Sequence, residues 1–120
     1  MMGITGNKKR TFITYVLKNE KGEIVYVGRA AGYGSPKDVL YGRLTKNHHV
    51  FESNPELVAD IIAIQGNRAA NMGAEEVWYT YFKGEGHTLL NKNPPLSWSK
   101  IKAPISRWRV RAYADDLLMP

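Results

Sequence analysis

Residues 13–28 read ITYVLKNEKGEIVYVG, and this stretch decides the fold. It joins two runs rich in β-branched and aromatic residues, 11–18 and 23–29, through the polar turn at 19–22, which ends in glycine. Residues of these types favour strands, and a short polar turn between two such runs is typical of a β-hairpin. The sequence therefore predicts two paired strands near its beginning.

The residues after the hairpin predict a helix, a third strand and a second helix. Ser35 is a good N-cap with proline next to it, so we expect a helix over about 36–46. Residues 57–64 are rich in Ile and Val and fit either a helix or a strand. A strand is preferred, because a lone hairpin is marginally stable. Asn67 can cap the next helix, which we expect to end near 83.

The length of 120 residues fits one domain with one modest core. The predicted fold is α+β, a small single-domain sandwich with a central three-stranded antiparallel or mixed sheet flanked by helices. Residues 1–10 are expected to be a flexible N-terminal segment and 11–97 the folded domain. Residues 98–120 are expected to be a basic C-terminal tail or an edge strand, since Trp108, Val110 and Ala112 alternate.

Charge and composition limit the possible functions. The formal charge of +6 divides into +6 over residues 1–50, −4 over 51–90 and +4 over 91–120. A basic surface beside an acidic one suits a polyanionic substrate handled near a carboxylate, although a merely basic domain fits equally well. There is no cysteine, which excludes disulfides and thiolate chemistry. No apolar run approaches the roughly 18 residues of a membrane span, so we expect a soluble protein without membrane contact.

Two tyrosines and a glycine are the first candidates for a site. Tyr15 and Tyr26 lie on the two paired strands, and Gly28 follows close behind the second tyrosine. A glycine in a strand leaves room for a substrate backbone to approach. Taken alone, a tyrosine in a strand is more often an ordinary packing residue.

Later segments add a cation and two imidazoles. Arg43 can project from the edge of the first helix, and His48 and His49 follow it. Adjacent histidines cannot face one metal as an i, i+4 pair can, so a zinc site is rejected. One of the two is kept as a hydrogen-bonding or proton-transfer group.

The acidic region adds a carboxylate and an amide. Glu75 and Glu76 lie on an amphipathic helix, where one of them can simply be solvated. The other, nearer the apolar face, would be costly to bury unless it held a metal or a cation. Asn91 precedes a Pro-Pro turn, where a turn hydrogen bond is the ordinary role for an asparagine.

Together these residues resemble the GIY-YIG nuclease family. The first family motif is similar to Ile13-Thr14-Tyr15 and the second to Tyr26-Val27-Gly28. Arg43 before a leucine, Glu75 on a later helix and Asn91 after an apolar pair follow in the family's order, with Arg29 as the alternative arginine. Glu75 matches better than Glu76, because large apolar residues stand three and four positions after it.

The resemblance implies hydrolysis of nucleic-acid phosphodiester bonds, with DNA favoured over RNA. It implies one Mg²⁺ or Mn²⁺ held by Glu75 and waters, Tyr15 and Tyr26 acting on the attacking water, and Arg43 stabilising charge on the phosphate. A tyrosine is a poor base at neutral pH, so a nearby cation must lower its pKa. The expected catalytic residues are Tyr15, Tyr26, Arg43, His48, Glu75 and Asn91. The expected substrate-binding residues are Gly28, Arg29, Lys46, His49, Arg107 and Arg109.

The chain also looks like the C-terminal toxin modules of bacterial polymorphic toxins, of the Rhs and contact-dependent inhibition type. This likeness rests on stretches such as RLTKNHHVF, IQGNRAAN and LLNKNPPLS. It implies delivery as part of a larger secreted protein, action in the cytoplasm of a target bacterial cell, and an acidic immunity protein as partner. The alternatives are a non-catalytic nucleic-acid-binding module on the same fold and a structural or protein-interaction domain.

Overall fold

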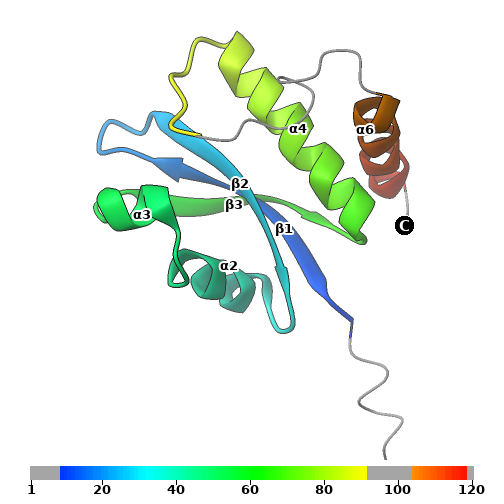
Figure 1. Ribbon diagram of the computed structural model, residues 1–120, viewed down its shortest axis with the longest axis horizontal. Coiled ribbons are helices and arrows are strands. Elements are labelled where there is room, and N and C mark those ends of the chain that lie inside the picture. The colour runs from blue at the N-terminus through cyan, green and yellow to red at the C-terminus, as the bar shows by residue number, and fades with distance from the viewer. Residues whose placement is uncertain (1–8, 92–103, 119–120) are drawn as a thin grey trace, which may run out of the picture.

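The computed structural model describes residues 9–91 and 104–118, with side chains described for 9–91 and 108–118. It is an α+β fold in which helices flank one three-stranded antiparallel sheet, as the sequence predicts (Figure 1). The elements, in chain order, are β1 (Thr11–Lys18), β2 (Ile24–Gly32), α2 (Pro36–Leu44), α3 (His49–Ser53), β3 (Val58–Gln65), α4 (Arg68–Gly84) and α6 (Pro104–Leu117).

The predicted hairpin forms β1 and β2, and β3 pairs with the other side of β1 in the order β2-β1-β3. The hairpin turn is closed by the Asn19 side chain, whose Oδ1 accepts hydrogen bonds from the N–H groups of Lys21 and Glu23 at 3.0 and 2.9 Å. Gly22 adopts a φ of 80°, which glycine tolerates best. Central β1 is thus covered on both edges, and its middle residues are fully buried.

The sheet has an apolar core on each face. Ile13, Tyr15 and Leu17 of β1 pack with residues of α2, α3 and the loop before β3. The alternate residue Val16 packs with Val27 against Tyr79 and Phe82 of α4 on the opposite face. Figure 1 accordingly shows α2 and α3 on one side of the sheet and α4 on the other. Because β1 is buried on both faces, it anchors both helical layers.

The caps predicted for α2 and α4 are confirmed. Ser35 and Asp38 form a capping box, with Pro36 in the first turn. The Asn67 side chain accepts a hydrogen bond from the N–H of Ala70 at 2.8 Å. Each such cap contributes about 1 kcal/mol to helix stability. The capping residues in the sequence therefore predict correctly where both helices begin.

The edge strand that was one of two alternatives for residues 98–120 is wrong for 104–117, which form helix α6 packed against α4. The alternating residues Trp108 and Val110 are exposed or half-exposed. The inward contacts come instead from Arg109, Tyr113 and Asp116, which lie four and three residues apart on one helical stripe. The apolar pattern misleads here because two of these three inward residues are charged.

Gly73 sets the distance between α4 and α6. A Cβ built on it would overlap the backbone carbonyl of Arg109, so only glycine allows this close approach of the two helices. Residues 1–8 and 92–103 lie outside the described structure, so the flexible N-terminal segment and the domain boundary at 97 stay predictions. Among the described residues, no helix combines the length and apolar character needed to cross a membrane.

Substituting Gly73→Ala should lower the free energy of unfolding by about 1–3 kcal/mol, because the added methyl group forces α6 away from α4. Urea unfolding measures the change, and limited proteolysis reports whether α6 is released. The control is Gly42→Ala in α2, where a Cβ meets nothing within 4 Å and should stabilise the helix by about 0.5–1 kcal/mol. Equal stability of Gly73→Ala and the parent would contradict the close helix contact.

Candidate active site

Five of the six predicted catalytic residues, all except Tyr15, meet at one pocket of about 150 Å³. The lining comes from β2, from α2 and α3 on one face of the sheet, and from α4 on the other, so the pocket lies where the two layers meet at the outer strand β2. Its lining residues are Tyr26, Arg43, His48, His49, Val50, Glu75 and Asn91. Five separate segments of the chain therefore converge on one place.

Tyr15 lies behind this pocket and is fully buried. Its Oη is 2.7 Å from Nε2 of His48, and its ring lies beside that of Tyr26 with 6.1 Å between ring centroids. Tyr26 also contacts the His48 ring edge-on at 4.9 Å. Tyr26 is thus the tyrosine that reaches the pocket, and Tyr15 supports it from within the core.

The hydrogen bonds of His48 define its protonation state. His48 is the N-cap of α3, and its Nδ1 accepts a hydrogen bond from the N–H of Phe51 at 3.2 Å. Asn47, with a φ of 56°, makes the left-handed turn that places His48 there. With Nδ1 as an acceptor, the neutral ring carries its proton on Nε2 and donates it to the Tyr15 oxygen.

Electrostatics agree with a neutral His48. Burial, together with the positive charge of Arg43, lowers the pKa of His48 to about 4. Both ring nitrogens are engaged, so His48 is a hydrogen-bonding residue. His49, in contrast, is exposed at the pocket wall. The hydrogen-bonding role therefore belongs to His48, and His49 is the imidazole that lies open to solvent at the pocket.

The two tyrosines do not have the lowered pKa that a basic role requires. Burial raises the pKa of Tyr15 well above its usual range and also raises that of Tyr26. Arg43 lowers both values, as expected of a nearby cation, but burial outweighs it. The interaction between the two hydroxyl groups raises the pKa of Tyr15 and lowers that of Tyr26. Both side chains are therefore neutral phenols at pH 7.

Gly28 serves a different purpose from the one its sequence position suggests. It pairs directly with Tyr15 across the hairpin. A Cβ on Gly28 would lie 2.5 Å from Cζ of Tyr15 and 2.7 Å from Cε1 of Tyr26. The expected room for a substrate backbone is filled by the protein's own aromatic rings, so we correct that interpretation.

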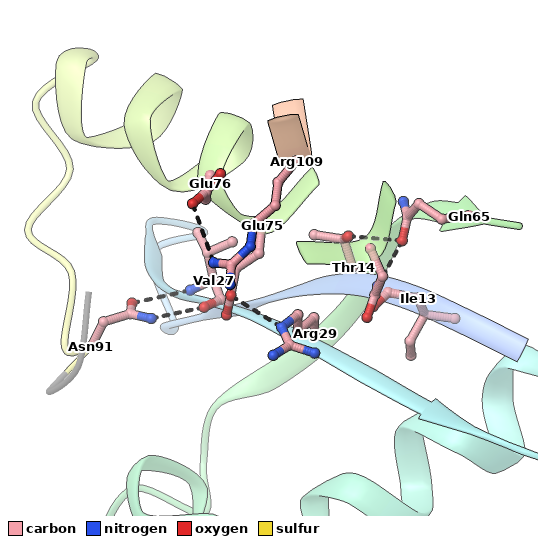
Figure 2. Close-up of polar contacts among 10 residues, drawn as sticks. Ile13, Thr14, Val27, Arg29, Gln65, Glu75, Glu76, Asn91 and Arg109 are labelled. Carbon is pink, nitrogen blue, oxygen red and sulfur yellow. Dashed lines mark hydrogen bonds and ion pairs between the residues drawn. The ribbon is translucent and has the colours of Figure 1, made fainter. Parts of the chain in front are cut away.

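Glu75 and Glu76 point to different neighbours, as adjacent residues of a helix do. Glu75 lines the pocket, and its Oε1 is 3.3 Å from Nε of Arg29 on β2 (Figure 2). Burial raises the pKa of Glu75, and Arg29 opposes that shift. Glu76 is buried and lies 3.7 Å from Nη1 of Arg109 on α6. Arg109 is therefore a partner of Glu76 that helps to attach α6, which corrects its expected role in contacting phosphate.

Asn91 holds the chain after α4 against the outer edge of β2. Its Nδ2 donates to the carbonyl of Val27 at 2.8 Å, and its Oδ1 accepts from the N–H of Val27 at 3.3 Å (Figure 2). The N–H of Leu90 donates to the carbonyl of Val25 at 2.6 Å. Asn91 thus extends the hydrogen-bonding pattern of the sheet edge, and its contribution to the pocket is to position the wall.

The remaining predicted substrate contacts lie in different places. Arg29 is half-buried beside Glu75. Lys46 is exposed and lines a neighbouring hollow together with Arg43. Arg107 belongs to α6, but its side chain is outside the described part of the structure.

Sequence reasoning missed a buried polar network that fixes α4 to β1. Nδ2 of Asn71 donates to the carbonyl of Ile13 at 2.9 Å and to Oε1 of Gln65 at 2.8 Å. The Thr14 hydroxyl donates to the same Gln65 oxygen at 3.2 Å (Figure 2). The sequence feature that could have predicted this role for Asn71 is helical spacing, because Asn71 lies one turn before Glu75 on the same helix face. The network orients the face of α4 that carries the carboxylate.

Comparisons with protein-family models, with curated proteins and with solved structures give no match for this chain. Within the described residues there is no group of three or more His, Asp or Glu side chains that could hold a metal ion. Glu75 is the acidic side chain in the lining of the pocket. A single carboxylate fits Mg²⁺, which keeps most of its water ligands, and does not fit an ion that needs several protein ligands.

The lowered pKa of His48 predicts a pH-dependent contribution to stability. An unfolded histidine titrates near 6.5, so between pH 6.5 and about 4 the unfolded chain binds a proton that the folded protein does not. The contribution is fully present above pH 6.5 and is lost as the pH falls toward 4. His48→Asn keeps an N-capping side chain and cannot titrate, so its deficit in unfolding free energy relative to the parent should shrink over this range. Urea unfolding at several pH values measures it, and a constant deficit would refute the assignment.

Proposed function

We propose that this chain is a metal-dependent endonuclease of GIY-YIG type, which hydrolyses phosphodiester bonds of nucleic acid, with DNA favoured over RNA. One observation carries the proposal: a phenol, a guanidinium, an imidazole and a carboxylate from separate segments line one small pocket. These groups are Tyr26, Arg43, His49 and Glu75. A structural domain has no need of this set around a cavity, whereas phosphodiester hydrolysis uses each member.

Arg43 and Glu75 provide the charges. Arg43 contacts the phosphate and stabilises the negative charge that develops on its oxygens. Glu75 would hold Mg²⁺ or Mn²⁺ as the one carboxylate ligand, and a cation there favours the charged form of an acid whose pKa burial raises. The bound ion would supply Lewis-acid assistance at the phosphate.

Tyr26 and His49 handle the attacking water. Tyr26 is a neutral phenol, held from behind by Tyr15, and it orients the water by a hydrogen bond. The water oxygen forms a bond to phosphorus, the bond from phosphorus to the leaving oxygen breaks, and the water proton passes to a base. The exposed imidazole of His49 is the base, because buried His48 is already hydrogen-bonded on both ring nitrogens. Solvent protonates the leaving oxygen.

The second candidate is a nucleic-acid-binding module without catalysis. One observation favours it: Arg29 is paired with Glu75 at 3.3 Å and so competes with a metal for the carboxylate. A binding module of this kind needs the basic surface but neither the carboxylate nor a divalent ion. The two candidates are therefore separated by the response to Glu75 substitution and to metal.

We propose further that the nuclease is an effector domain of a larger secreted toxin and acts in the cytoplasm of a target bacterial cell. The likeness of its sequence stretches to polymorphic toxin modules supports this. The formal charge of +6 makes an acidic immunity protein the expected inhibitor, since complementary charge speeds association and favours the right partner.

Substituting Glu75→Gln should reduce cleavage by about 100-fold or more, because it removes the ligand charge while leaving the shape of the side chain. The assay follows DNA, as supercoiled and as heat-denatured plasmid, and total RNA, each with Mg²⁺ or with EDTA. The control is Glu85→Gln, an exposed carboxylate just after α4, which should cleave like the parent. Cleavage of neither substrate by the parent, or equal cleavage by both variants, would sink the nuclease assignment.

Mg²⁺ should also raise the melting temperature of the parent more than that of Glu75→Gln. A ligand that binds only the folded protein stabilises it by about 2.7 kcal/mol at 100 times its Kd. Differential scanning calorimetry with Mg²⁺ and with matched ionic strength from NaCl measures this without any turnover. A shift of the same size in parent and variant would place the metal somewhere other than Glu75.

A further inference from the structure

A second hollow adjoins the pocket and shares Arg43 with it. We call it the side hollow. It has a volume of about 410 Å³ and lies between the end of β2 and α2. Its lining residues are Ala30, Ala31, Gly32, Tyr33, Asp38, Val39, Gly42, Arg43 and Lys46. A group that occupies the side hollow is therefore next to whatever Arg43 contacts in the pocket.

The inner wall of the side hollow is made by small residues, and Gly42 is the informative one. It lies in the last turn of α2, two residues before the helix ends, and glycine within a helix costs up to about 0.5–1 kcal/mol relative to alanine. Its φ is not positive, and a Cβ built on it would meet nothing within 4 Å. Neither backbone conformation nor packing requires this glycine. What it provides is open space in the side hollow.

Tyr33 provides an aromatic ring at the rim. Its side chain is 59% exposed, yet its backbone is held from both sides. On one side Gly32 pairs with Thr11 of β1, and on the other the Thr11 hydroxyl donates to the carbonyl of Gly34 at 2.8 Å. An exposed ring on a fixed backbone can stack on a flat ligand at a small cost in entropy.

The charges around the side hollow favour an anion at its mouth. Arg43 and Lys46 are the cations in its lining. The acid in the lining, Asp38, is engaged in the capping box of α2, where its Oδ2 accepts from the N–H of Ser35 at 3.4 Å. Its negative charge therefore lies at the positive N-terminal end of the helix. A phosphate at Arg43 and Lys46 with a flat group in the hollow beside it matches one nucleotide.

We propose that the side hollow receives the base of an unpaired nucleotide that adjoins the phosphate bound at Arg43, with Tyr33 stacking on the base. The substrate class is accordingly single-stranded nucleic acid, because a base within a duplex must first be unstacked and unpaired, which costs free energy that an unpaired base does not require. This inference deepens the proposed nuclease function and rests on it for the identity of the ligand.

The test measures binding separately from cleavage. Fluorescence anisotropy in EDTA compares a labelled single-stranded 12-mer, in DNA and in RNA, with the duplex of the same sequence. Tyr33→Leu should weaken single-strand binding by about 5- to 150-fold, the range expected for one stacked base. Tyr33→Phe should bind like the parent, because it keeps the ring. Gly42→Leu, which fills the side hollow, should weaken single-strand binding. Gly42→Ala adds only a methyl group and should weaken it less than Gly42→Leu does.

Tyr41→Leu is the matched control. Tyr41 is 72% exposed on the same helix as Gly42 but does not line the side hollow, so its loss should leave binding unchanged. Replacing single bases of the 12-mer by abasic sites should locate one position whose loss weakens binding to the parent. The same loss should not weaken binding to Tyr33→Leu, because that variant already lacks the stacking contact with this base. Thermal unfolding of each variant checks that the fold is intact.

Three results would overturn the inference: Tyr33→Leu binding within twofold of the parent, equal weakening by Tyr41→Leu, or duplex binding as tight as single-strand binding. Failure of the proposed function gives a different pattern. If the protein binds single strands through Tyr33 but cleaves nothing, the binding role of the side hollow stands and the nuclease function is rejected. If the protein cleaves nucleic acid but Tyr33→Leu and Gly42→Leu do not change binding, the nuclease function stands and the binding role of the side hollow is rejected.

Discussion

The contact between the ring of Tyr15 and the α-carbon of Gly28 is the constraint on which the candidate site depends. Only glycine leaves space for that ring, because any other residue at position 28 would place its Cβ 2.5 Å from Cζ of Tyr15. The ring directs the Tyr15 hydroxyl into the core beneath α3, where it accepts the proton of His48 at 2.7 Å. His48 in turn caps α3, which places His49 at the pocket. One cross-strand pair therefore supports, through a hydrogen bond, the residue at which a helix begins on another layer.

Helix α4 links the pocket to the C-terminal helix through two adjacent glutamates. Successive residues of a helix are separated by about 100° around its axis, so Glu75 and Glu76 have different ion-pair partners. Glu75 faces Arg29 and the pocket, and Glu76 faces Arg109. The ion pair between Glu76 and Arg109 therefore helps to hold α6 against α4. The network around Asn71 fixes the same helix to β1.

Patterns within one element allowed most of the fold to be predicted. The hairpin and the caps at Ser35 and Asn67 depend on local residue types. The third strand was preferred over a helix only because a hairpin alone is marginally stable. The grouping of Glu75 and Asn91 with the tyrosines came from the resemblance. The helix at 104–117 was missed because charged residues make its inward stripe, and an apolar pattern cannot report a buried ion pair. The pKa of Tyr15 was misjudged because burial depends on the neighbouring layer, which no single segment encodes.

Arg43 joins the pocket and the side hollow, so α2 acts as a single rigid support for both. The helix is only nine residues long, and isolated helices of that length are unstable in water. Its position depends on the capping box of Ser35 and Asp38 and on Val39, which is buried against β1. A strained or displaced α2 would shift the phosphate contact and the rim of the side hollow together. The two sites are therefore parts of one binding surface, whose dimensions are set by the core beneath α2.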